Sequence, residues 1–210
     1  MPLSPQRWKR VTESAFPWEA EALEYLRAAL PDCDPYYGWT NFSFIADDGT
    51  VNEVDALIAT PRGLFLVEIK SDDGELRGDR GTWTYHKSNG RQKTVDNPLL
   101  HADRKCKKLK SLLERQPACR VERLPFIEPL IFLSNPELKN LLPDPDRIRI
   151  CQRDRDNAPG IIAALKFRNA PSLKQDVPSS TVPSSNNSLA PSMKPASAPH
   201  NATAASATMS

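Results

Sequence analysis

Three charged side chains stand in the two strand-like runs of a mainly apolar segment of this 210-residue chain, VNEVDALIATPRGLFLVEIK at 51–70, which also carries Glu53 near its start and Arg62 in a turn. They are Asp55, Glu68 and Lys70. The turn residues at 61–63, Pro-Arg-Gly, are typical of a β-hairpin. In an antiparallel hairpin with this turn, Asp55 and Glu68 fall nearly opposite each other, and a bulge in the turn would shift the register by one residue. Glu68 and Lys70 share a face because side chains alternate along a strand.

Two carboxylates that face each other in an apolar hairpin repel and resist burial, so they need a compensating cation. Mg²⁺ meets this need, since it is typically held by one or two carboxylates together with water and phosphate oxygens. Lys70 beside them would position the nucleophile or hold the negative charge that develops on a phosphate. The three residues therefore predict phosphodiester hydrolysis. The spacing also fits an alternative, in which Asp55 and Lys70 form a partly exposed ion pair and Glu68 is solvated.

Hydrophobic periodicity and turn signals predict the elements that would position this hairpin. Helices are expected over 17–30, 97–115 and, in a short form, 160–165. Strands are expected over 41–45, 51–60, 64–70, 82–86, 92–95, 126–133 and 148–151. The order of helix, strands, helix and strands favours an α/β sandwich in which one mixed sheet is flanked by helices.

The composition divides the chain into a folded part and a polar part. Beyond Phe167 there is no aromatic residue, and the chain continues in runs such as VPSSTVPSSNNSLAPSM. A segment of this kind cannot bury enough apolar surface to offset its ordering entropy. We therefore expect a disordered Pro/Ser/Ala/Thr-rich tail at 169–210, which follows a folded domain at 13–168 and an N-terminal extension at 1–12.

Charge and hydropathy restrict the class of protein further. The formal net charge is only +2, so binding to nucleic acid would require a local basic patch. The sequence has neither a membrane-length apolar run nor the apolar core of a signal peptide, which predicts a cytoplasmic protein without a membrane partner. The four cysteines are widely spaced, without a Cys-x-x-Cys pair, and are expected to be reduced thiols rather than zinc ligands.

The predicted helix over 97–115 carries a local basic patch. Its basic residues lie away from the apolar stripe, and four of them are expected to contact DNA phosphates in a salt-dependent way. These four are Arg104, Lys105, Lys107 and Lys108. A solvated charged face that touches no nucleic acid is an equally common alternative.

In consistent order, about residues 13–133 resemble the nuclease-related domain (NERD) family of the PD-(D/E)xK nuclease superfamily. The likeness rests on WEAEALEYL, NEVDALIATPRGLFLVEIK, GELRGDRGTW and DNPLLHADRKCKKLKSLL. It implies a restriction-endonuclease-like α/β core with a mixed β-sheet flanked by helices. RGDRGTW and NPLLHADRKCKKLKSLLERQ are similar in particular to the N-terminal domain of large phage-defence protein kinases (BREX and phage-growth-limitation type). This similarity implies defence-system proteins as possible partners.

The resemblance also implies the members of a metal site: a first-helix glutamate, a strand aspartate and a Glu-x-Lys pair. In this sequence they are Glu19, Asp55, Glu68 and Lys70. The backbone carbonyl of Ile69 is implied as a further metal ligand, and Mg²⁺ or Mn²⁺ as the cofactor. Glu21 is the alternative first-helix acid, because Trp18 stands where family members commonly have glycine.

The implied function is metal-dependent hydrolysis or processing of DNA, with phage defence as the context. The alternative is a catalytically silent nucleic-acid-binding or regulatory module, the truncated N-terminal part of a larger kinase. The run Val67-Glu68-Ile69-Lys70 superficially matches the Val-Ala-Ile-Lys of a kinase strand. The sequence contains no Gly-x-Gly-x-x-Gly, His-Arg-Asp or Asp-Phe-Gly motif, so we do not expect a kinase active site in this segment.

Overall fold

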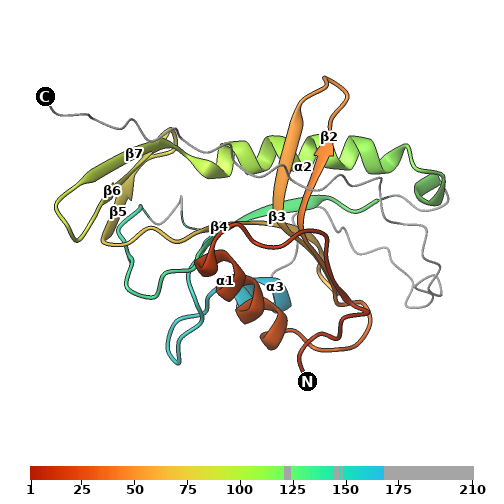
Figure 1. The fold of residues 1–210 in the computed structure, drawn as a ribbon, viewed down its shortest axis with the longest axis horizontal. Helices are drawn as coiled ribbons and strands as arrows, with labels where there is room; N and C mark the ends of the chain where they lie inside the picture. The colour runs from red at the N-terminus through yellow and green to blue at the C-terminus, as the bar shows by residue number, and fades with distance from the viewer. Residues whose placement is uncertain (121–123, 144–146, 148, 168–210) are drawn as a thin grey trace, which may run out of the picture.

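The structure is a computed structural model that describes residues 1–120, 124–143, 147 and 149–167. Along the chain its elements are β1 (Trp8–Arg10), α1 (Pro17–Ala29), β2 (Tyr37–Ile45), β3 (Val51–Thr60), β4 (Gly63–Lys70), β5 (Glu75–Gly78), β6 (Thr82–His86), β7 (Gln92–Asp96), α2 (Pro98–Glu114), the 3₁₀ turn η1 (Pro117–Arg120), β8 (Ile127–Leu133), β9 (Lys139–Asn140), β10 (Ile150–Cys151) and α3 (Ile161–Phe167) (Figure 1). The tail expected at 169–210 lies outside the described residues.

The strands form two sheets. The larger has six strands in the order β1-β2-β3-β4-β8-β10, and the smaller has four in the order β7-β6-β5-β9. The larger sheet is mixed, because β2, β3 and β4 are antiparallel neighbours while β8 runs parallel to β4. The predicted α/β class with a mixed sheet flanked by helices is confirmed, and the smaller sheet is an addition that the sequence did not predict.

The central hairpin β3–β4 forms as its turn signal predicts. Thr60 pairs with Gly63, and the ladder continues to Ala56 opposite Val67. Gly63 has φ +129°, a conformation that a side chain would strain, so the glycine is what permits this tight turn. Most of the hairpin is buried on both faces, as expected for strands covered by helices on one side and by further structure on the other.

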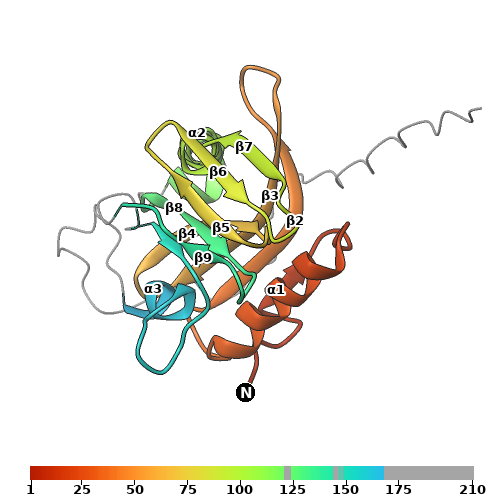
Figure 2. The ribbon, with the colours of Figure 1, turned by 90° about the vertical axis from the view of Figure 1, so that its left-hand side faces the viewer.

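The helices lie on opposite faces of the larger sheet. Two views agree that α1 and α3 lie on one side and α2 on the other (Figures 1 and 2). On the first side, the buried Leu23 and Leu26 of α1 pack in one cluster with Val67 and Ile69 of β4. On the second side, the apolar stripe of α2 packs against alternate residues of the same sheet; its members are Ala102, Cys106, Leu109 and Leu113.

α2 begins where the sequence predicts. Asn97 is its N-cap, and the side-chain Oδ1 accepts a hydrogen bond from the backbone N–H of Leu99 at 2.9 Å. Pro98 occupies the first turn, where its missing N–H leaves no hydrogen bond unmade. Asn97 Nδ2 also donates to the carbonyl of Arg80 at 3.1 Å, which ties the start of α2 to the loop before β6. One asparagine thus sets both the start of the helix and its position.

The segment expected as an N-terminal extension at 1–12 takes part in the fold. Within it, β1 pairs in parallel with β2, which adds an edge strand to the larger sheet. Leu3 is fully buried and Trp8 is 9% exposed. The backbone N–H of Leu3 donates to the carbonyl of Arg27 at the end of α1. These contacts fasten α1 against β2, and α1 carries Glu19, the predicted first-helix acid.

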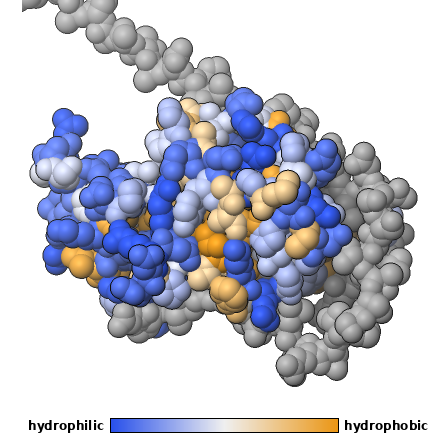
Figure 3. Space-filling view, turned by 90° about the horizontal axis from the view of Figure 1, so that it is seen from below, coloured by the Kyte–Doolittle hydropathy of each residue, from blue (hydrophilic) through white to orange (hydrophobic). Residues whose placement is uncertain are grey.

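The surface on the α1 side shows apolar side chains near the centre of the view, between margins that are mainly hydrophilic (Figure 3). A mixed surface of this kind is normal for a folded domain. In the part of the chain that the structure describes, every helix is too short or too polar to cross a lipid bilayer.

Candidate functional site

The site lies where β3 and β4 separate. The last residue pair of their ladder is Ala56 opposite Val67, which agrees with the predicted register. Beyond this pair a side chain replaces the backbone ladder: Asp55 Oδ2 accepts a hydrogen bond from the backbone N–H of Ile69 at 2.7 Å. Asp55 and Glu68 are thereby brought to the same end of the hairpin. The carboxylate of Asp55 is fixed by the backbone of the strand that carries the other acid.

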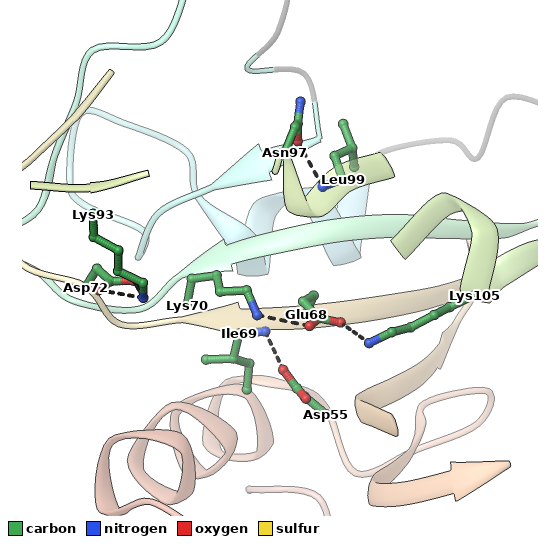
Figure 4. Close-up of polar contacts among 9 residues, drawn as sticks. All are labelled: Asp55, Glu68, Ile69, Lys70, Asp72, Lys93, Asn97, Leu99 and Lys105. Carbon is green, nitrogen blue, oxygen red and sulfur yellow. Dashed lines mark hydrogen bonds and ion pairs between the residues drawn. The ribbon is translucent and has the colours of Figure 1, made fainter. Parts of the chain in front are cut away.

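Glu68 is held by two lysines (Figure 4). Its Oε1 accepts from Lys70 Nζ at 3.0 Å, and its Oε2 accepts from Lys105 Nζ at 2.7 Å. Only 14% of the Glu68 side chain is exposed. The alternative drawn from the sequence, a solvated Glu68 with Lys70 paired to Asp55, is therefore wrong: Lys70 pairs with the neighbour that shares its strand face.

Burial and charge set the pKa values of this cluster. Burial, followed by the charge of Glu68, raises the pKa of Asp55 to about 7. Burial alone would raise the pKa of Glu68, but the charges of Lys70 and Lys105 outweigh it and the pKa is lowered. Burial likewise opposes the charge of Lys70, yet Glu68 and Asp55 raise the pKa of its ammonium group. Around neutral pH, Glu68 and Lys70 are charged while Asp55 is poised to gain or lose its proton.

Glu19 approaches the site through Asn41 of β2. Asn41 Nδ2 donates to Glu19 Oε1 at 2.6 Å and to Ser14 Oγ at 3.0 Å. The β2–β3 ladder passes from Thr40 opposite Ala56 to Phe42 opposite Val54, so Asn41 and Asp55 occupy the positions between these two pairs. Asn41 has φ +53°, which an asparagine tolerates better than most residues. This irregular backbone conformation is what turns its amide toward α1.

Asn41 is a residue that sequence reasoning missed. Its Oδ1 is buried and accepts no hydrogen bond from the described residues. A buried acceptor of this kind is costly unless a water, a cation or a ligand completes it. The sequence carries only a weak signal for the contact of Asn41 with Glu19. An asparagine within a predicted strand indicates an irregular backbone, but it does not indicate which side chain its amide will contact.

Glu21, the alternative first-helix acid, points elsewhere. It forms an ion pair with Arg153, and 60% of its side chain is exposed. Arg153 in turn donates to the carbonyl of Ser134 at 2.6 Å. The contacts thus favour Glu19 over Glu21 as the acid of α1 that faces the hairpin, and the role of Glu19 at a metal stays a prediction.

The basic residues of α2 divide by their partners. Lys105 contacts Glu68, Lys107 pairs with Asp103 at 2.7 Å, and Lys108 pairs with Asp48 at 2.8 Å in the turn between β2 and β3. Arg104 is exposed. The prediction that these side chains contact DNA remains open, but Lys105 lies in the carboxylate site, which the sequence did not indicate.

A second charged cluster adjoins the first and was also missed. Asp72 follows the end of β4, and 11% of its side chain is exposed. It accepts from Lys93 Nζ of β7 at 3.0 Å and pairs with Lys87 Nζ at 3.1 Å. Figure 4 shows Asp72 and Lys93 on the Lys70 side of the site. The smaller sheet therefore places two lysines next to the site, a contact that only the tertiary fold creates.

The donors present suit a hard divalent cation. Asp55, Glu68 and the carbonyl of Ile69 offer oxygen atoms, and burial together with the charge of Glu68 raises the pKa of Asp55, which a bound cation would counteract. No cluster of three or more His, Cys, Asp or Glu side chains placed to hold a metal occurs among the residues that the structure describes. A cation here would depend on two carboxylates with water and substrate oxygens, which is the usual arrangement for Mg²⁺.

Comparison with known proteins places this geometry in a family. Residues 14–134, more than half of the chain, match the family described as "Nuclease-related domain" (NERD). A protein of Streptomyces coelicolor named "Probable kinase PglW" is 45% identical over 115 residues, which are 55% of this chain and 7% of that protein. The chain thus spans a small part of this relative's length. No solved structure matches the chain.

Proposed function

Because the chain belongs to the nuclease-related domain family, we propose that it is a metal-dependent nuclease domain that hydrolyses phosphodiester bonds of DNA. The observation that supports this proposal most directly is the meeting of Asp55, Glu68 and Lys70 at one end of the β3–β4 hairpin, where both acids are partly buried. Ionised acids in such a place cost folding free energy, and acids with perturbed pKa values are concentrated at functional sites.

Asp55 and Glu68, together with the carbonyl of Ile69, would hold Mg²⁺ or Mn²⁺, and Glu19 would assist from α1. The ion, when bound, supplies Lewis-acid stabilisation of the charge on the phosphate. Lys70 is fully charged at neutral pH and would hydrogen-bond the attacking water or a non-bridging phosphate oxygen. In the hydrolysis the water oxygen forms a bond to phosphorus and gives up a proton to solvent, while the bond from phosphorus to the sugar oxygen breaks and that oxygen takes up a proton from solvent to leave as an alcohol.

The test is cleavage of plasmid and linear DNA by the purified chain with Mg²⁺, with Mn²⁺ and with EDTA. Asp55→Ala and Lys70→Ala should each lower the cleavage rate by about a hundredfold or more, since each removes a group that acts on the reacting phosphate. Glu53→Ala, an exposed acid on the same strand as Asp55, and Lys110→Ala, a paired lysine on α2, are the matched controls and should cleave like the wild type. Equal rates in all variants would exclude the site assignment.

A second candidate function is favoured by the pairing of Glu68. Two lysines already neutralise this acid, which is consistent with a catalytically silent module that binds nucleic acid or regulates a partner. Such a module would bind DNA equally well as wild type and as Lys70→Ala, and EDTA would leave the affinity unchanged. A fluorescence-anisotropy titration with labelled DNA in both conditions separates it from the nuclease.

We also propose the biological context. The relative from Streptomyces coelicolor is named a probable kinase, and the matched segment is a small part of it. A nuclease-related domain at this position would act in the cytoplasm as one module of a phage-defence protein, with other defence proteins as partners. Co-purification of the tagged chain with the products of neighbouring genes tests this context.

A further inference from the structure

Both oxygens of the Glu68 carboxylate are occupied by cations of the chain itself. Lys70 Nζ lies 3.0 Å from Oε1, and Lys105 Nζ lies 2.7 Å from Oε2. The shorter contact is the one made by Lys105, and only 18% of the Lys105 side chain is exposed. A divalent cation that binds Glu68 must therefore approach an oxygen that already has an ammonium group against it.

The two lysines differ in how they are anchored. Lys70 is two residues from Glu68 on the same face of β4, so the strand itself keeps their side chains together. Lys105 reaches the site from α2, a separate element, through a long side chain with many rotamers. Lys105 is therefore the lysine whose backbone is not tied to that of Glu68, and rotation of its side chain alone would take its ammonium group away from the strand.

The charges of the site show why Lys105 would have to leave Glu68 when a metal binds. The acids Asp55 and Glu68 are balanced by the ammonium groups of Lys70 and Lys105, so the cluster is close to neutral when both acids are ionised. A divalent cation added to this set would be attracted to the acids and repelled by both lysines at short range. Metal binding is therefore weak while Lys105 stays on Glu68 and becomes stronger when its charge moves away.

The position of Lys105 indicates what would receive its charge. It extends from the basic side of α2, where Arg104 is exposed next to it. A phosphate of a nucleic acid that lies along α2 would offer an anion in place of Glu68. Building on the proposed function, we propose that Lys105 is an internal competitor of the metal for Glu68, which moves to a nucleic-acid phosphate and so couples metal binding to substrate binding. By linkage, bound metal and bound nucleic acid then strengthen each other.

The test measures metal binding rather than cleavage. Mn²⁺ is titrated into the whole chain, and free Mn²⁺ is followed by electron paramagnetic resonance. Lys105→Met keeps most of the unbranched side chain and removes its charge, and it should lower the Kd for Mn²⁺ by about tenfold. Lys110→Met is the matched control: this lysine also lies on α2, pairs with Glu114 at 3.5 Å and is 24% exposed, and its replacement should leave the Kd unchanged.

The same titration is repeated with a non-cleavable phosphorothioate DNA duplex present. The duplex should lower the Kd for Mn²⁺ in the wild type and have a smaller effect in Lys105→Met, because the competing charge is already absent. A Lys105→Met variant that binds Mn²⁺ no better than the wild type, while Asp55→Asn abolishes binding, would overturn the role of Lys105 and leave the nuclease proposal standing. An absence of Asp55-dependent Mn²⁺ binding in every variant would overturn both.

A measurement on the wild-type chain covers the case in which Lys105→Met does not fold. Reductive methylation followed by mass spectrometry reports how accessible each lysine amine is. Saturating Mg²⁺ should increase the labelling rate of Lys105 and leave that of Lys110 unchanged. Labelling of Lys105 that is indifferent to Mg²⁺ would show that metal and lysine do not compete, and would overturn the proposal.

Discussion

Replacing Asp55 by asparagine should make the metal-free protein more stable at alkaline pH. The side-chain amide of the Asp55→Asn variant would keep an oxygen that accepts the N–H of Ile69, so the hydrogen bond that fixes the wild-type carboxylate is preserved. What the substitution removes is a negative charge that is withdrawn from water and lies near Glu68. The same substitution should abolish metal binding, because it removes one of two anionic ligands.

The pKa of Asp55 gives the size of this effect. It rises from an ordinary value of 3.8 to about 7 in the folded protein. Each unit is worth ~1.4 kcal/mol, so the ionised form costs at most about 4 kcal/mol of folding free energy. Below pH 3.8 the acid is protonated in both folded and unfolded chains and costs nothing. Since the folded pKa is raised, stability is lost as the pH rises from the ordinary value to about 7, and the cost is complete above that.

The assay is urea unfolding of the wild type and Asp55→Asn in EDTA at pH 5 and at pH 8. The difference between the two proteins removes the contribution of titrating groups that do not interact with Asp55, and what remains is the effect of its charge, including that on Glu68. The free energy of unfolding should favour Asp55→Asn by a larger margin at pH 8, and in thermal melts the gap should reach about 10 °C. An equal difference in stability between the two proteins at both pH values, or an Asp55→Asn variant that is less stable than the wild type at pH 8, would refute the account of Asp55 as an acid whose ionised form destabilises the fold.

Two further predictions concern the residues that position the site. Asn97→Ala removes the N-cap of α2 and should lower the free energy of unfolding by about 1 kcal/mol, measured by urea unfolding, while Asn97→Asp keeps the acceptor for the N–H of Leu99, loses the donor to the carbonyl of Arg80, and should retain only part of it. Asn41→Gly removes the amide that holds Glu19, and glycine adopts the positive φ of this position without strain. The variant should therefore bind Mn²⁺ more weakly. Asn41→Ala should do the same and also lose about 1 kcal/mol of stability from its positive φ. Unaltered Mn²⁺ affinity in both variants would exclude the Asn41 contact from the site.

Parts of the site were predictable because they depend on neighbours in the chain. The Pro-Arg-Gly turn indicated the register of β3 and β4, so Asp55 and Glu68 were expected nearly opposite each other in the hairpin. The Asn97-Pro98 pair likewise predicted the start of α2. In each case the hydrogen bonds that decide the structure join residues close in sequence, and the residue types alone select them.

Other parts depended on packing between distant segments. Glu19 and Glu21 point about 160° apart on one helix, and only the docking of α1 beside β2 shows that Glu19 meets Asn41. The smaller sheet brings Lys93 of β7 to Asp72. This sheet could not be predicted as a whole, because its edge strand β9 has only two residues and leaves no readable pattern. Such contacts arise from how elements are stacked, which no local pattern in the sequence specifies.

The sequence by itself indicated that two acids and a lysine would gather in a buried hairpin. The tight turn places Asp55 nearly opposite Glu68, and alternation along the strand places Glu68 and Lys70 on one face. Only the tertiary structure decided what surrounds them. Lys105 lies away from the apolar stripe of α2 and is expected from the sequence to face solvent, yet the packing of α2 across β4 brings its ammonium group to Glu68. The balance of charge at the site is therefore a property of how a helix lies on a sheet.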